Sequence, residues 1–124
     1  MVADVPPEFE PTTADRIARN DALFREANER IREKAEEYGV EIPVPFVCEC
    51  ADPTCREVVR LALDDYRAIR EHPRRFLNIP GHEASAKGWA QPVADGDGYR
   101  VVEKIGRAGE IVEALEEPVE EGTV

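Results

Sequence analysis

Three cysteines gathered within eight positions constrain this chain more than any other feature of its sequence. They are Cys48, Cys50 and Cys55 in the stretch FVCECADPTC, and the chain has no other cysteine. An odd number of cysteines cannot be paired completely in disulfides within one chain. A reducing compartment would keep them as thiols or as metal ligands. The cluster therefore predicts a metal site, which would help a chain of this size to hold a thin core.

The spacing of the cysteines fits a metal-binding turn. Cys48 and Cys50 are two residues apart, so on a strand their side chains would leave the same face. The segment ADPT then predicts a turn that brings Cys55 back, because Asp52 can accept from nearby amides and Pro53 fixes a backbone angle. Amides of such a turn can also donate to the sulfurs. The alternative is that the cysteines pack in the core as small hydrophobes. Their neighbours are instead typical of a turn: Glu49, Asp52, Pro53 and Thr54.

A tetrahedral zinc site needs a fourth ligand, and the two histidines are the candidates. His72 stands at the end of a predicted helix, where an imidazole also suits the helix dipole. His82 follows a Pro-Gly turn that can direct a side chain toward the cysteines, and we favour it. The sequence predicts zinc on Cys48, Cys50, Cys55 and His82, with an iron-sulfur cluster on the same residues as the alternative. If His82 did not bind, an open site could be catalytic, with Glu83 as its general base.

The remainder of the chain predicts an α+β fold in which a long N-terminal helix packs on a small sheet, with a zinc knuckle and further short helices. An apolar stripe predicts the helix from residue 15 to Gly39: Ile17, Phe24, Ala27, Ile31, Ala35 and Tyr38. We expect this stripe to face the core, although it could also form a coiled-coil seam between two chains. Gly39 suits the left-handed residue that ends a helix.

Shorter elements are expected after the helix. Residues 40–50 are predicted to be an extended approach to the cysteines, 58–62 to form a strand, and 64–71 to form a helix that Asp64 caps. A strand over 74–79 ends in the Pro-Gly turn, 87–98 form a loop, 99–106 form a strand, and 107–117 form a terminal helix. We expect disordered tails at residues 1–14 and 118–124, around a single domain over 15–117.

Charge limits the partners that this chain would bind. Its net charge is -11, which disfavours nonspecific binding to nucleic acid or anionic lipid, because such binding depends on Lys and Arg. Six arginines gather in residues 56–76, where we expect them to pair with neighbouring acids on a solvated face. No apolar run approaches the length of a membrane span and no signal peptide is visible, so we expect a cytoplasmic protein.

Four blocks of the sequence resemble a family of small actinobacterial hypothetical proteins. They are ARNDALFREANERI, FVCECADPTC, LDDYRAIREHPRRFLNIPGHE and YRVVEKIGRAGEI, which together span roughly residues 16–113. The resemblance implies that the cysteine block and PGHE belong to one pattern, which supports His82 as a ligand. This chain departs from the pattern at LALDDY, where a Thr before the acidic residue would be more usual. The resemblance implies no catalytic residues.

The function expected from these observations is that of an interaction or regulatory module with a structural Cys3His zinc site. Its partner would be another protein, and the chain would be a monomer or a helix-mediated dimer. A metal-dependent enzyme or a redox protein with an open zinc or iron-sulfur site is the alternative. No Ser/His/Asp or Cys/His nucleophile arrangement stands out in the sequence.

Overall fold

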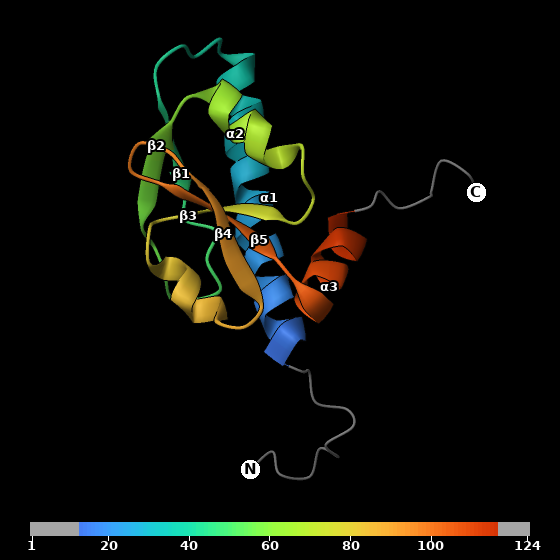
Figure 1. Cartoon of the computed structure of the whole chain (residues 1–124). Helices are drawn as coiled ribbons and strands as arrows, with labels where there is room; N and C mark the ends of the chain where they lie inside the picture. The colour runs from blue at the N-terminus through green and yellow to red at the C-terminus, as the bar shows by residue number, and fades with distance from the viewer. Residues whose placement is uncertain (1–12, 117–124) are drawn as a thin grey trace, which may run out of the picture.

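A computed structural model describes residues 13–116 of the chain and confirms the α+β architecture (Figure 1). The elements in chain order are α1 (Thr13–Glu37), β1 (Val44–Val47), β2 (Val58–Leu61), α2 (Leu63–Arg70), β3 (Arg75–Asn78), the 3-10 helix η2 (His82–Ala86), β4 (Ala90–Asp95), β5 (Arg100–Lys104) and α3 (Gly106–Glu116). The predicted tails lie outside the described residues, except that α1 already begins at Thr13 and Ala14 is buried.

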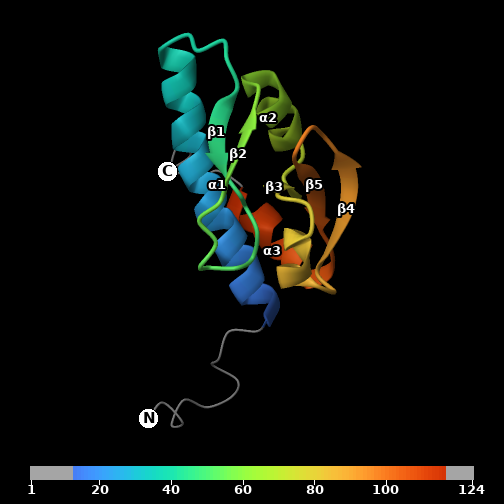
Figure 2. The same ribbon diagram turned by 90° about the vertical axis from the view of Figure 1, so that its left-hand side faces the viewer.

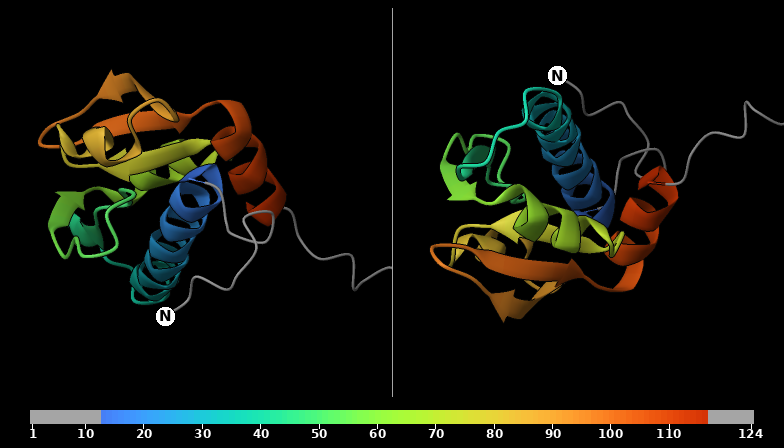
Figure 3. Two further views of the ribbon diagram at one scale, coloured as in Figure 1. Left: turned by 90° about the horizontal axis from the view of Figure 1, so that it is seen from below. Right: turned by 90° about the horizontal axis from the view of Figure 1, so that it is seen from above.

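The strands form two separate antiparallel sheets. β1 and β2 make a hairpin sheet, and the other sheet has the order β3-β5-β4. α1 runs along one side of the molecule, with the hairpin sheet against its C-terminal half and α3 against its N-terminal half (Figure 2). Viewed from below and from above, β2 lies at the margin of the molecule with β1 between it and α1 (Figure 3).

The three-stranded sheet separates two apolar cores. Phe76 and Val102 face the core formed with α3 and the start of α1, and Leu77 and Val101 face the core formed with the hairpin sheet and α2. These residues are paired across β3 and β5, so successive pairs serve opposite faces of the sheet. Both faces of β3 and β5 are therefore buried at these two pairs, which agrees with the consecutive valines Val101 and Val102 in the central strand.

The predicted apolar stripe of α1 is partly wrong. Ile17 and Ala35 are buried, but Ala27 is exposed and Tyr38 has 73% of its surface exposed. The buried face of α1 instead has three polar side chains: Asp21, Arg25 and Asn28.

Two of these polar side chains are buried because α1 packs against strand edges. Asn28 Nδ2 donates to the carbonyl of Val47 at 2.8 Å, and its Oδ1 accepts from the Val47 amide at 2.8 Å, so this side chain covers the outer edge of β1. Arg25 covers the outer edge of β3, where it donates to the carbonyls of Pro73 and Arg75 with its guanidinium over the Phe76 ring. Backbone groups at a strand edge need polar partners, which an apolar stripe cannot provide.

Two local predictions are wrong and one is confirmed. α2 has Ala62 at its N-cap without a side-chain cap, so Asp64 lies inside the first turn. The predicted loop over 87–98 contains β4, an edge strand whose residues are almost all exposed, which is why it lacks an alternating apolar pattern. Gly39 has a φ of +64° after the end of α1, as predicted.

The third polar residue of α1, Asp21, forms a buried ion pair with β5. Lys104 Nζ lies 2.7 Å from Asp21 Oδ2, and the two side chains are 1% and 0% exposed. Burial raises the pKa of Asp21 to about 7, although the charge of Lys104 acts to lower it. Because the folded-state pKa lies above the ordinary value of 3.8, the contribution of Asp21 to stability is greatest below that value and is lost as the pH rises toward 7.

Replacement of Lys104 by methionine should strongly destabilise the protein. The variant leaves the Asp21 carboxylate buried without its counter-ion, so urea unfolding at pH 7 should show a free energy of unfolding lower by about 3–5 kcal/mol. The loss should shrink at pH 5, because protonation of the buried Asp21 carboxyl costs less free energy as the pH falls toward its ordinary pKa of 3.8. The double variant Asp21→Leu/Lys104→Met should regain most of the loss, because neither position then holds an unpaired buried charge. Equal stability of Lys104→Met and the parent protein at pH 7 would contradict this account.

Candidate metal centre

Four side chains from three neighbouring segments meet at one end of the hairpin sheet. Cys48 and Cys50 follow β1, Cys55 precedes β2, and His82 begins η2. One sulfur or nitrogen atom from each lies within 4.8 Å of the other three, so these residues could hold a metal ion. The structure thus brings together the four residues that the sequence predicts as ligands.

The distances within the group fit a tetrahedral ion. His82 Nδ1 lies 3.5 Å from the sulfur of Cys48 and 3.7 Å from the sulfur of Cys55. Zinc bound at about 2.3 Å to sulfur and 2.0–2.1 Å to nitrogen with tetrahedral angles would separate such atoms by about 3.6 Å. The group is therefore arranged close to the geometry that a mononuclear site requires.

The turn between Cys50 and Cys55 forms as predicted. Asp52 Oδ1 accepts from the amide of Thr54 at 2.9 Å and from its hydroxyl at 2.7 Å. The amide of Cys55 donates to the carbonyl of Asp52 at 3.1 Å, which closes the turn. These bonds fix Cys55 opposite the two cysteines that follow β1.

Each sulfur also receives a backbone amide. Ile79 donates to Cys48 at 3.3 Å, and the amides of Asp52 and Glu57 donate to Cys50 and Cys55 respectively. The thiol of Cys48 donates to Cys50 and lowers the pKa of Cys50 to about 5, with the Asp52 amide acting in the same direction. The pKa of Cys48, the donor, is raised above its ordinary range by this bond and by burial. Amides aimed at sulfur stabilise the thiolate charge that a bound metal requires.

The backbone around His82 sets the direction of its ring. Gly81 has a φ of +97°, a left-handed conformation that glycine adopts readily, so the predicted Pro-Gly turn is present. Ser85 donates to the carbonyl of His82 at 2.8 Å and accepts from the amide of Ala51 at 3.1 Å, which ties η2 to the cysteine turn. The second ring nitrogen, Nε2, lies 3.6 Å from a carboxylate oxygen of Glu57. A carboxylate at that position favours the tautomer whose Nδ1 is free to bind a metal.

The other predicted site residues lie away from the group. His72 is exposed in the turn that follows α2. Glu83 accepts from the amide of Gly81 at 2.9 Å with one oxygen, and its other oxygen lies 2.9 Å from Arg100. Both carboxylate oxygens of Glu83 are therefore engaged elsewhere, which removes the base that the open-site alternative needs.

Glu49 is the residue near the site that the sequence misplaced. Its residue type is typical of a turn, but Glu49 is fully buried between Cys48 and Cys50, which follow β1. Its Oε2 accepts from Asn28 at 2.8 Å and from the hydroxyl of Tyr66 at 2.6 Å, and its Oε1 accepts from the amide of Leu77 at 2.8 Å. Burial raises the pKa of Tyr66, which remains a hydrogen-bond donor. The alternation of buried residues at 44, 46, 48 and 50 pointed away from a buried position 49, so no sequence signal could have found it.

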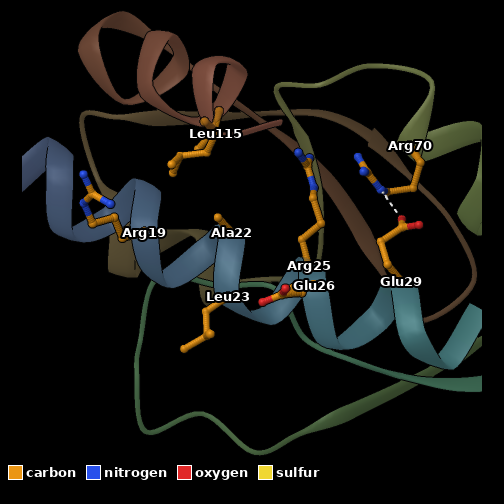
Figure 4. A pocket seen from close by; sticks show the side chains of 9 residues that line it. Arg19, Ala22, Leu23, Arg25, Glu26, Glu29, Arg70 and Leu115 are labelled. Atoms are coloured by element: carbon orange, nitrogen blue, oxygen red, sulfur yellow. Dashed lines mark hydrogen bonds and ion pairs between the residues drawn. The ribbon is translucent and has the colours of Figure 1, made fainter. Parts of the chain in front are cut away.

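A pocket of about 400 Å³ lies between α1 and α3, and none of the four residues of the candidate metal centre lines it (Figure 4). Ala22, Leu23 and Leu115 form its apolar side. Of its charged side chains, Arg70 is bound to Glu29 at 2.5 Å and Arg25 covers the edge of β3. These arginines serve the fold, and the pocket gathers no set of groups for acid–base or nucleophilic chemistry.

No helix among residues 13–116 has the length and apolar character needed to cross a membrane. Comparison of the chain with models of protein families, with curated proteins and with solved structures found no match in any of the three.

Proposed function

We propose that this protein binds one zinc ion through Cys48, Cys50, Cys55 and His82, and that the ion is structural in a small interaction or regulatory module. The observation that carries the proposal is the convergence of the four ligand atoms within 4.8 Å of one another. Thiolate and imidazole together are ligands that zinc prefers.

The compact arrangement of the ligands favours a single ion over an iron-sulfur cluster. A two-iron cluster divides its four ligands between two metal atoms, so ligands on opposite irons lie well apart. Here the largest separation within the group is no more than 4.8 Å, and His82 Nδ1 lies 3.5 Å from the sulfur of Cys48 and 3.7 Å from that of Cys55. A mononuclear tetrahedral site accommodates these distances without rearrangement.

A structural role follows from the completeness of the ligand set. Four protein ligands leave no position for water or substrate on a tetrahedral zinc ion. Cys48 and Cys50 are each 1% exposed, so the ion would sit against the interior of the molecule. It would join the hairpin sheet to η2 and thereby to the three-stranded sheet. Thiolates of this kind persist in a reducing compartment, which agrees with a cytoplasmic location.

Metal analysis of the purified full-length protein tests the proposal. We expect one zinc per chain and no absorption in the visible range. After replacement of zinc by Co²⁺, the spectrum should be that of a tetrahedral thiolate site, and added cyanide should leave it unchanged because no coordination position is open. A brown protein with two irons per chain would overturn the zinc assignment. A cobalt spectrum that responds to cyanide would overturn the structural role.

A further inference from the structure

The outer edge of β2 has backbone groups without partners in the described part of the chain. The amide of Cys48 donates to the carbonyl of Glu57 at 2.9 Å, and hydrogen-bonded pairs alternate along an antiparallel ladder. Val59 and Leu61 therefore bond to β1, and the N–H and C=O groups of Val58 and Arg60 point away from it. Neither Val58 nor Arg60 forms another hydrogen bond or ion pair with residues 13–116.

The remaining sheet edges of the described residues are protected. Asn28 covers the edge of β1, where Pro45 also lacks a donor, and Arg25 and Glu49 cover the edge of β3. β4 carries Pro92, with a register shift between Pro92 and Ala94. Proline, bulges and polar coverage are among the features that block strand addition, and β2 has none of these three.

The exposed face of β2 has a distinct chemical pattern. Residues 56, 58 and 60 share one parity and present an arginine, a valine and an arginine. Val58 is 52% exposed, and Arg60 is exposed as well. The guanidinium of Arg56 donates to the carbonyls of Pro53 and Cys55, each at 2.9 Å, and is thereby fixed beside the metal site. A basic, apolar, basic stripe stands out on a chain of net charge -11.

We propose that this edge binds an extended acidic segment of a partner protein, which adds to β2 as an antiparallel strand. The segment would place an apolar side chain opposite Val58 and carboxylates opposite Arg56 and Arg60. Main-chain hydrogen bonds to Val58 and Arg60 would provide affinity, and the side-chain pattern would provide specificity. The inference deepens the proposed interaction role by naming the surface and the chemistry of the partner.

Charge complementarity favours this occupant over a second copy of the chain. In a symmetric β2–β2 pairing centred on Val59, Val58 would lie opposite Arg60, and the two Arg60 side chains would be diagonal neighbours of like charge. Two chains of net charge -11 would also repel each other, whereas an acidic segment gains attraction at this basic stripe.

Binding of a defined peptide to the zinc-loaded full-length protein tests the proposal. The probe is a fluorescein-labelled peptide TETVTET, measured by fluorescence anisotropy, with TKTVTKT as the charge-reversed control. We expect TETVTET to bind, and its affinity to fall about tenfold or more in Arg60→Glu, because an attraction becomes a repulsion. Val58→Pro removes an N–H that faces away from β1, so it should also weaken binding while the ladder to β1 stays intact. Arg30→Glu makes the same charge change at an exposed position of α1, outside β2, and should leave the affinity unchanged.

Amide chemical shifts locate the bound peptide. In the ¹⁵N-labelled protein, TETVTET should change the amide chemical shifts of residues 57–61 more than those of the residues that line the pocket between α1 and α3. The proposal is overturned by absence of TETVTET binding, by equal binding of TKTVTKT, or by an affinity that Arg60→Glu leaves unchanged. It is also overturned if the protein forms a concentration-dependent dimer that Val58→Pro abolishes, because the edge is then occupied by a second copy. Zinc is measured in the same samples, so a failure of the metal site is seen separately from a failure of peptide binding.

Discussion

The Cys50→Ser variant should lose its metal, and the segment from the end of β1 to η2, which contains the four ligands, should unfold. Cys50 is buried, and a serine oxygen is a poor substitute for a thiolate on zinc. Zinc bound at a structural site contributes its binding free energy to folding, on the order of 10 kcal/mol in small domains. This exceeds the whole stability of many domains. Metal content by mass spectrometry and a thermal melt followed by circular dichroism would measure both effects.

Thr54→Ser is the matched control for this variant. It lies in the same turn, keeps the hydroxyl that donates to Asp52, and removes no ligand. It should retain one zinc per chain and nearly the parent melting temperature. A Cys50→Ser protein with full zinc content and an unchanged melting temperature would refute the site.

The two histidines should respond very differently to replacement by alanine. His82→Ala removes the only nitrogen of the ligand group, and we expect metal affinity to fall by about a hundredfold or more, since three thiolates remain. His72→Ala should change the affinity little, because His72 is exposed in the turn after α2. Titration of each apo-variant with zinc in the presence of a competing chelator at neutral pH gives the affinities.

The pair of histidine variants also separates a structural ion from a catalytic one. Loss of metal in His72→Ala with retention in His82→Ala would reverse the ligand assignment. Unchanged affinity in both variants would mean that water or a carboxylate completes the site, which would favour the open-site alternative. A selective loss in His82→Ala agrees with a closed tetrahedron.

The candidate metal site could be predicted from the sequence because its signals are local. The spacing of Cys48 and Cys50, the Asx turn at Asp52 and the Pro-Gly turn before His82 each follow from short-range backbone preferences. The chain has two histidines, so a histidine as the fourth ligand had to be either His72 or His82. η2 was not predicted, because its five residues carry no periodic signal.

The orientation of α1 could not be predicted in the same way. The apolar residues of this helix suggested a face directed at the core, but the buried face is set by the strand edges that it meets. Arg25 and Asn28 look like ordinary surface residues until the positions of β1 and β3 are known. Likewise, the buried position of Glu49 depends on Tyr66 and Leu77, which are distant in sequence. Side chains that satisfy backbone groups of another element are a tertiary property, which sequence periodicity does not contain.

The coverage of β1 and β3 by α1 has a consequence for the behaviour of partly unfolded molecules. Asn28 and Arg25 lie within one turn of each other on the same helix, so local detachment of that helix would uncover two strand edges at once. Uncovered edges are templates for intermolecular strand pairing, and Val44, Phe46 and Leu77 would become accessible beside them. Aggregation of this protein should therefore begin from states in which α1 has separated while the sheets persist. Substitutions that strengthen the middle of α1 should slow aggregation more than they raise the melting temperature.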